Sequence, residues 1–142
     1  MTDRIAKDHI GAVQPRTLPK PQGFSYGYEV KRGRLVFIAG QVARDADNNV
    51  VGKGDLVAQF RQVCANIQAV VNAAGGDMAD IVKLTIYVLD VAAYKQQLRQ
   101  IGGVYREYFG KHFPAMTLVG ARDLFDAADG CLIEIEGVAA LA

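Results

Sequence analysis

A change of hydrophobic period along the chain constrains its fold more than any other feature. Between residues 56 and 70, apolar residues recur three or four positions apart, which is the spacing of one helical face. They are Leu56, Phe60, Val63, Ile67 and Val70. Between residues 81 and 89 the period falls to two, as in a strand that presents different residues to its two faces. Val82, Leu84, Ile86 and Val88 are expected on one face, and Lys83, Thr85 and Tyr87 on the other.

Capping residues support this first helix and a second one. Asp55 is a suitable N-cap for the first helix, and Gly75 suits the position after its end. The second helix is predicted from about residue 91 to residue 109, with Asp90 before it and Gly110 after it. Its apolar stripe is Tyr94, Leu98, Ile101, Tyr105 and Tyr108. The pair Gly102-Gly103 should cost this helix about 1 kcal/mol per glycine relative to alanine, so we expect another group to approach the backbone there.

Short β-rich runs complete the pattern. Residues 26–30 and 35–39 flank Gly33 and predict a hairpin, and residues 115–120 and 131–139 predict two later strands. Residues 1–22 contain three prolines and read as an irregular lead-in. The order β-β-α-β-α-β-β predicts one two-layer α+β domain over residues 1–142, with both helices on one face of a mixed sheet. The other face mixes polar and apolar side chains, so we expect it to meet another subunit.

Composition excludes several classes of function. The net charge of +1 argues against a dedicated nucleic-acid binder, which needs concentrated basic charge. No apolar run approaches the ~20 residues that span a bilayer, and no secretory signal follows Met1. Cys64 and Cys131 are far apart in sequence, and we interpret them as reduced, buried thiols of a cytoplasmic protein, with a disulfide or a metal pair as the alternative.

Two short motifs resemble metal or phosphate sites, but neither has the required residues at the required spacing. The run from Asp45 to Asn49 begins like a calcium loop, but Val50 and Leu56 occupy the positions that need Gly and Glu. The run 52–54, Gly-Lys-Gly, is too short to hold a phosphate. We therefore expect neither a metal nor a cofactor.

Two carboxylates on the last strand are the strongest candidates for chemistry. Glu134 and Glu136 are two residues apart, so they should share a face of the sheet. One interpretation is that they lie on a solvated strand face or form an ion pair with another subunit. The other is that one of them orients or activates a water molecule. His112, at the junction of the second helix and the next strand, is interpreted as structural or exposed, because no nucleophile is paired with it by a known spacing.

Four segments resemble the RidA/YjgF family, also called endoribonuclease L-PSP-like. The resemblance runs in order from about Gly23 to Ala139. The segments are Leu35-Val36-Phe37-Ile38-Ala39-Gly40-Gln41, the stretch from Asn66 through Gly75 to Val88, Phe113-Pro114-Ala115-Met116-Thr117-Leu118-Val119, and Ile133-Glu134-Ile135-Glu136-Gly137-Val138-Ala139. The resemblance implies a chorismate-mutase-like fold, a homotrimer, and a small-molecule cleft between neighbouring subunits.

In the deaminating branch of that family, an arginine grips the carboxylate of a 2-imino acid while a glutamate places the attacking water. The resemblance assigns the glutamate's role to Glu134, but Met116 stands in the arginine's place. The other implied substrate-binding positions are Phe24, Tyr26, Ala39, Gly40, Gln41, Tyr105, Thr117 and Leu118. Three further positions depart from the family pattern, at residues 23–26, at Ala39 and at Gly102, whereas Tyr105 is retained.

These departures leave several functions open. The first is an imine or enamine deaminase whose substrate is more apolar than usual, because methionine is apolar and adaptable. The second is a non-catalytic metabolite-binding or regulatory homotrimer, and the third is a ribonuclease or translation inhibitor, which the weak basic surplus disfavours. A purely structural or chaperone-like role is the last. Arg44 or Lys83 is a candidate to replace the missing arginine.

Overall fold

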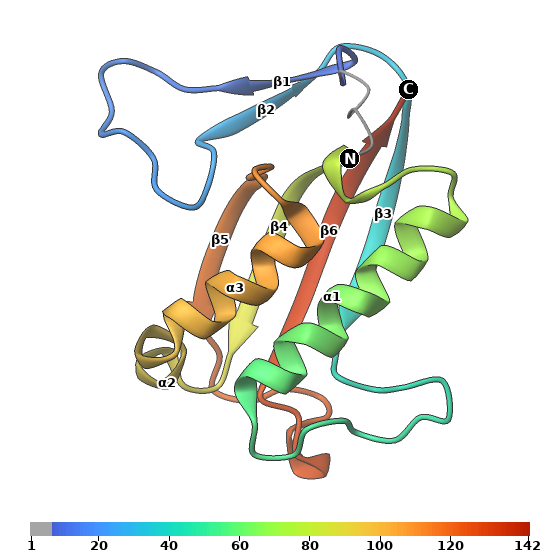
Figure 1. The fold of residues 1–142 in the computed structure, drawn as a ribbon, viewed down its shortest axis with the longest axis vertical. Helices are drawn as coiled ribbons and strands as arrows, with labels where there is room; N and C mark the ends of the chain where they lie inside the picture. Colours follow the sequence, from blue (N-terminus) through green and yellow to red (C-terminus); the bar gives the residue numbers. More distant parts are fainter. Residues whose placement is uncertain (1–6) are drawn as a thin grey trace.

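The main sheet has four strands in the order β3-β6-β4-β5, and a separate two-stranded ribbon joins β1 to β2 (Figure 1). We describe residues 7–142 of a computed structural model. Neighbours in the main sheet are antiparallel except β4 and β5, which are parallel, so the sheet is mixed as expected. The strands are β1 (Ile10–Val13), β2 (Gly27–Val30), β3 (Arg34–Gln41), β4 (Ile81–Val88), β5 (Ala115–Gly120) and β6 (Ile133–Leu141).

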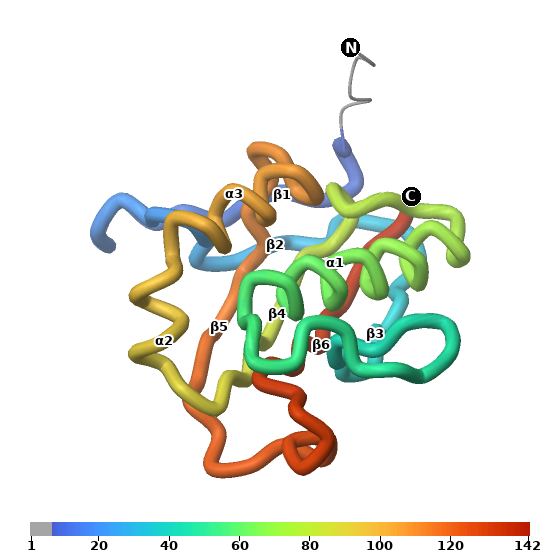
Figure 2. Tube along the Cα trace, turned by 60° about the horizontal axis from the view of Figure 1, so that its bottom comes forward, coloured from blue at the N-terminus to red at the C-terminus, as the bar shows by residue number. Residues whose placement is uncertain are grey.

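Both long helices cover the same face of the main sheet, as predicted (Figures 1 and 2). The helices are α1 (Leu56–Ala73), α2 (Val91–Gln96) and α3 (Leu98–Phe109), with short 3-10 turns η1 (Met78–Asp80) and η2 (Ala127–Asp129). The side chain of Asp55 accepts a hydrogen bond from the Ala58 amide at 3.0 Å, which makes it the expected N-cap of α1. No helix within residues 7–142 has the length and the apolar character needed to cross a membrane.

The second predicted helix is in fact two helices, separated at Gln97. The Gln97 side-chain amide donates to the Ala93 carbonyl at 3.2 Å, and the Gln97 backbone amide also donates to the carbonyls of Ala93 and Tyr94. A side chain that binds a nearby carbonyl in this way competes with the regular helical pattern. The break turns α3 relative to α2 and lets α3 lie along the sheet beside α1 (Figure 2).

The predicted hairpin between residues 26–30 and 35–39 is wrong. β2 pairs with β1, which lies within the predicted irregular lead-in, and β3 pairs with β6 at the other end of the chain. Gly33 has a positive φ of 108°, as expected, but it is needed because the backbone here passes close to the end of β6 and not because it forms a hairpin turn. A Cβ at Gly33 would collide with the Leu141 carbonyl, so only glycine lets the chain pass from β2 into the main sheet here.

The hydrophobic core lies between the helices and the main sheet. The α1 stripe of Leu56, Phe60, Val63 and Ile67 is buried there, as are Leu84, Ile86 and Val88 of β4. Val82 differs from the sequence prediction, because an irregularity between Ile81 and Lys83 turns it to a second cluster with Ile10 and Ala140. The face away from the helices carries Glu134, Glu136 and Tyr87, and the Tyr87 hydroxyl donates to the Glu136 carboxylate at 2.8 Å.

A buried glutamine joins two loop segments at the N-terminal end of α1. Gln59 is fully buried, and its amide nitrogen donates to the carbonyls of Gly52 at 3.1 Å and Gly130 at 2.8 Å. Its amide oxygen accepts from the Leu132 backbone amide at 2.8 Å. One side chain therefore satisfies three backbone groups that have left the regular sheet and helices.

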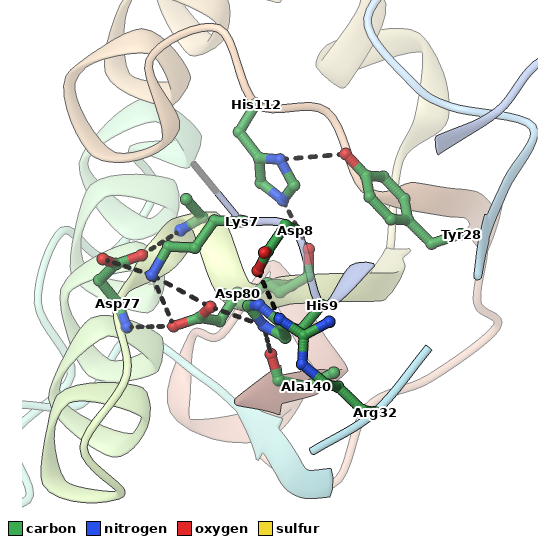
Figure 3. Close-up of polar contacts among 11 residues, drawn as sticks. Lys7, Asp8, His9, Tyr28, Arg32, Asp77, Asp80, His112 and Ala140 are labelled. Atoms are coloured by element: carbon green, nitrogen blue, oxygen red, sulfur yellow. Dashed lines mark hydrogen bonds and ion pairs between the residues drawn. The ribbon is translucent and has the colours of Figure 1, made fainter. Parts of the chain in front are cut away.

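Polar contacts hold the start of the described chain against the sheet (Figure 3). The Nε2 atom of buried His9 lies 2.7 Å from the Ala140 carbonyl and 3.3 Å from Asp80 Oδ1. Lys7 Nζ is 3.1 Å from Asp77 and 3.2 Å from Asp80. These contacts fix the segment that continues into β1, so the predicted irregular lead-in contains a strand that the prolines did not suggest.

His112 has a structural role on the same side of the molecule (Figure 3). Its Nε2 atom lies 2.6 Å from the Ile81 carbonyl, and its Nδ1 atom lies 3.3 Å from the Tyr28 hydroxyl. These contacts join the turn after α3 to β4 and to the ribbon. They agree with the interpretation of His112 as a structural residue.

Candidate functional site

The sequence-derived candidates fall into two groups, and the first surrounds β5. Ser25 fixes the loop after residue 22 to this edge, because its amide donates to the Pro114 carbonyl at 3.0 Å and its hydroxyl to the Phe113 carbonyl at 2.5 Å. Phe24 and Tyr26 flank this anchor, with ring centroids 5.1 Å apart in an edge-to-face contact. The Tyr26 hydroxyl donates to the Pro19 carbonyl at 2.7 Å.

Met116 and Leu118 point from β5 toward the helices. They pair in register with Leu84 and Ile86 of β4 and pack against the same core. Thr117, between them, faces the opposite side of the sheet, where Lys83 Nζ donates to its hydroxyl at 3.1 Å. Lys83 therefore does not share the Met116 side of the sheet in its own chain.

Tyr105 of α3 lines the same pocket as Met116, and its ring contacts two other aromatic rings. Its ring stacks on Phe109 at 4.5 Å and on Phe113 at 5.4 Å between centroids. Its hydroxyl donates to the His112 carbonyl at 2.6 Å, and burial raises the pKa of this hydroxyl. The Tyr105 hydroxyl is thus a neutral donor already used by the backbone, and the ring acts as a wall.

A pocket of about 390 Å³ lies beneath α3 and includes Met116 and Tyr105. Its volume falls within the range of small-molecule sites. Its rim is exposed and contains Gln22, Gly23, Leu98, Arg106 and Lys111. Its interior is formed by buried apolar residues of α1, α3 and the sheet, namely Phe60, Ile67, Leu84, Ile86, Ile101, Phe109 and Ile135.

Cys64 also lines this pocket, and its thiol is unreactive. Burial raises its pKa to about 12, so it remains a neutral thiol at physiological pH. Cys131 is likewise buried and free, and burial raises its pKa too. Both cysteines are therefore reduced in the structure, as the sequence suggested. The described residues contain no group of three or more His, Cys, Asp or Glu side chains that could hold a metal ion.

The second group of candidates lies where β3 meets β6. The pairing of these strands is irregular between Ile38 and Gln41, so Ala39 and Gly40 leave the regular ladder. Gly40 lies against the Glu134 side chain, and a Cβ at this position would collide with the carboxylate. Gln41 donates from its side-chain amide to the Ala39 carbonyl at 3.2 Å.

The Glu134 carboxylate is half-buried and faces away from the helices. Residue 134 pairs with Tyr87, and its neighbours Ile133 and Ile135 point the other way, into the core. No hydrogen bond or ion pair joins this carboxylate to any of residues 7–142. Both of its oxygens are therefore available to a water molecule or a ligand.

Arg44 is committed elsewhere. Its guanidinium is 3.0 Å from Asp126 and 2.8 Å from Asp129, and it also donates to the Asn48 carbonyl. The hydrogen bond to Asp126 is the main cause of its raised pKa. Arg44 thus fastens the loop before β6 and does not line the pocket below α3.

Met116 and Glu134 therefore lie on opposite faces of one sheet. They are also two strands apart, since β4 separates β5 from β6, which is about 10 Å at the usual strand spacing. One chain does not bring the two groups of candidates together. The residues that sequence reasoning missed are the rim cations Arg106 and Lys111. The spacing of Arg106 one turn after Gly102 was the available signal.

Comparisons with known proteins agree on one family. A family model described as Endoribonuclease L-PSP matches residues 18–141. A RutC family protein of Pyrococcus horikoshii is 39% identical over 121 residues, which cover 85% of this chain and 90% of the relative. A protein of Dermatophagoides farinae named 2-iminobutanoate/2-iminopropanoate deaminase is 30% identical, covering 84% of this chain and 88% of the relative.

Solved structures show the same likeness in three dimensions. The crystal structure of the Rid family protein YyfB from Yersinia pestis superposes with a TM-score of 0.82 at 36% identity. The superposition covers 94% of this chain and 99% of that chain. A Mycobacterium tuberculosis member of the YjgF/YER057c/UK114 family has a TM-score of 0.62 at 32% identity, covering 84% of this chain and 87% of that chain.

Proposed function

Because the chain belongs to the RidA/YjgF (endoribonuclease L-PSP-like) family, we propose that it is a hydrolytic imine or enamine deaminase with a more apolar substrate than simple 2-imino acids. The observation that carries this proposal is the Glu134 carboxylate, which is half-buried, packed against Gly40 and not hydrogen-bonded to residues 7–142. A carboxylate in this state can accept a hydrogen bond from water and orient it. The deaminase name of the mite relative is consistent with this chemistry.

The reaction needs only water and a proton relay. A water molecule held by Glu134 attacks the imine carbon, and its proton passes through the carboxylate to the imine nitrogen. The resulting carbon bears both a hydroxyl and an amino group. Its C–N bond then breaks, ammonia leaves, and a carbonyl remains, so one imine and one water give one ketone and one ammonia. The reaction requires neither a metal nor a cofactor.

We further propose that the reacting cleft forms between two copies in a homotrimer. Met116 and Glu134 occupy opposite faces of one sheet, so a cleft that uses both must take them from different chains. The face that carries Glu134 also exposes apolar side chains: Leu35 is 51% exposed and Phe37 is 76% exposed. Leaving these side chains in water is unfavourable, and a second copy of the sheet would cover them.

The assembly is tested by its mass. Sedimentation equilibrium should give three times the 15.3 kDa chain mass, and Phe37→Lys should shift the population toward monomer because it places a charge in an apolar contact. Phe125→Lys is the matched control, since Phe125 is 97% exposed but lies in the loop before β6. A monomer for the unaltered chain, or a trimer that Phe37→Lys leaves intact, contradicts the proposed interface.

The chemistry is tested by ammonia release from imines that an amino-acid oxidase generates in the assay. Glu134→Gln keeps the size of the side chain but removes the base, so the acceleration should fall by about 100-fold or more. Glu136→Gln, on the same face of the same strand, should leave the rate near that of the unaltered protein. If no imine is hydrolysed faster than in buffer, or if Glu134→Gln is as active as Glu136→Gln, the deaminase proposal fails.

A further inference from the structure

We propose that the pocket beneath α3 binds an amphipathic carboxylate, with the carboxylate held by Arg106 at the rim and the apolar chain inside the pocket. This inference deepens the proposed function, because it names the substrate class of the half-site that contains Met116. In this proposal Arg106 on α3 binds the anion, because β5 carries Met116 where the family's deaminating branch has an arginine. The proposal also implies that the substrate keeps its negative charge although the strand arginine is absent.

The Arg106 guanidinium lies at the pocket rim, close to the glycine pair of α3. Arg106 lines the pocket and is exposed at its rim. An ideal Cβ at Gly102 would lie 3.5 Å from Arg106 Nη1, and one at Gly103 would lie 4.0 Å from Nη2. The guanidinium thus lies back along α3 over the glycine pair, and this is the group that approaches the helix backbone there. Any larger side chain at residue 102 would compete with it for this space.

The guanidinium has unused hydrogen-bond donors. No hydrogen bond or ion pair joins the Arg106 side chain to any of residues 7–142. The nearest acid along the helix, Glu107, is held by Arg61, and that hydrogen bond lowers the pKa of Glu107. Lys111 adds a second cation to the rim, and no acidic residue is among those that line the pocket. The rim therefore favours an anion, and a planar guanidinium suits a carboxylate.

The residues that line the interior of the pocket determine how polar the remainder of the ligand can be. Most of the interior wall is made of buried apolar side chains, and three side chains with a polar atom, Cys64, Tyr94 and Tyr105, also line it. Of these three, only the Tyr94 hydroxyl is open to a ligand, since it makes no hydrogen bond to any of residues 7–142. The Cys64 thiol is neutral and only a weak donor, and the Tyr105 hydroxyl donates to the His112 carbonyl at 2.6 Å. A polar group placed in this space away from Tyr94 would lose its hydrogen bonds to water without replacement. The part of the ligand inside the pocket should therefore be mainly hydrocarbon.

Calorimetric titration with straight-chain carboxylates from butanoate to octanoate tests the inference. Each methylene that leaves water should tighten binding about fourfold, until the pocket is full. Arg106→Ala should weaken octanoate binding about tenfold, a modest loss because the guanidinium is exposed. Octan-1-ol, which has the chain but no charge, should bind equally to both forms. Arg99→Ala is the matched control, since Arg99 is exposed on α3 but does not line the pocket.

Three outcomes overturn the inference: no saturable octanoate binding at millimolar concentration, affinity that does not depend on chain length, or equal octanoate affinity for Arg106→Ala and Arg99→Ala. The octan-1-ol arm shows whether Arg106→Ala has kept a folded pocket. The result is also separable from the deaminase test. Octanoate binding without ammonia release would overturn only the chemistry, and ammonia release without octanoate binding would overturn only this assignment of substrate.

Discussion

Replacing Met116 by arginine should raise the rate of 2-iminopropanoate hydrolysis about 10- to 150-fold in kcat/KM. A charge-assisted bond to a carboxylate contributes about 1.5–3 kcal/mol, and bidentate arginine provides its strong form. Met116 lines the pocket and is half-buried, so an arginine here can extend its guanidinium toward solvent while its stem stays packed. The measurement is ammonia release with the imine produced in the assay by an amino-acid oxidase.

Met116→Leu is the control, because it keeps an apolar side chain of similar size and should leave this rate unchanged. The double variant Met116→Arg with Arg106→Ala should retain the gain, since the new guanidinium then supplies the clamp alone. A thermal midpoint and a sedimentation mass equal to those of the unaltered protein establish that the variant is folded and assembled. With those two values intact, an unchanged rate on 2-iminopropanoate would show that the missing arginine does not limit activity.

Replacing Gln59 by alanine should lower the free energy of unfolding by about 3 kcal/mol or more. The substitution leaves the Gly52 and Gly130 carbonyls and the Leu132 amide without their buried partner, and each such loss costs about 1–3 kcal/mol. For a chain of this length, the thermal midpoint should fall by roughly 10 °C. Denaturant unfolding followed by circular dichroism measures both quantities.

Gln68→Ala provides the comparison on the same helix. Gln68 is half-buried on α1, and its side chain makes no hydrogen bond within residues 7–142, so its loss should cost well under 1 kcal/mol. Equal stability of the two variants would show that water replaces the Gln59 amide at all three backbone groups.

Sequence periodicity located the elements whose pattern is contained in their own residues, wherever their partners lie along the chain. The stripe of α1 and the alternation of β4 are local patterns, and the structure confirms the helix of residues 56–73 and the strand of residues 81–88. The pairing of β3 was mispredicted because its partner lies at the far end of the chain, with Arg34 opposite Leu141. A turn signal at Gly33 indicates a change of direction, but it does not specify which strand the chain joins next.

The candidate site was predictable only in part for a similar reason. Strand alternation placed Glu134 and Glu136 on a common face, and helical spacing placed Tyr105 on the inner side of its helix. The opposite orientations of Met116 and Glu134 depend on the order β3-β6-β4-β5, which no local pattern contains. Arg106 could not be predicted, because its position depends on the space that the missing side chain of Gly102 leaves for the guanidinium, and a glycine pair in a helix only indicates that some group lies close.

The division of the site between two faces of one sheet has a consequence for how such proteins diversify. In the function we propose, ligand choice belongs to the helix side, where Met116, Gly102 and Arg106 can be exchanged as a set. The Glu134 carboxylate, which we propose directs the water, lies on the other side, where Gly40 and the ladder to β4 constrain it independently. Mutations that alter recognition need not disturb the chemistry, so a lineage can adopt a new metabolite by substitutions on one surface of the sheet while selection preserves the other.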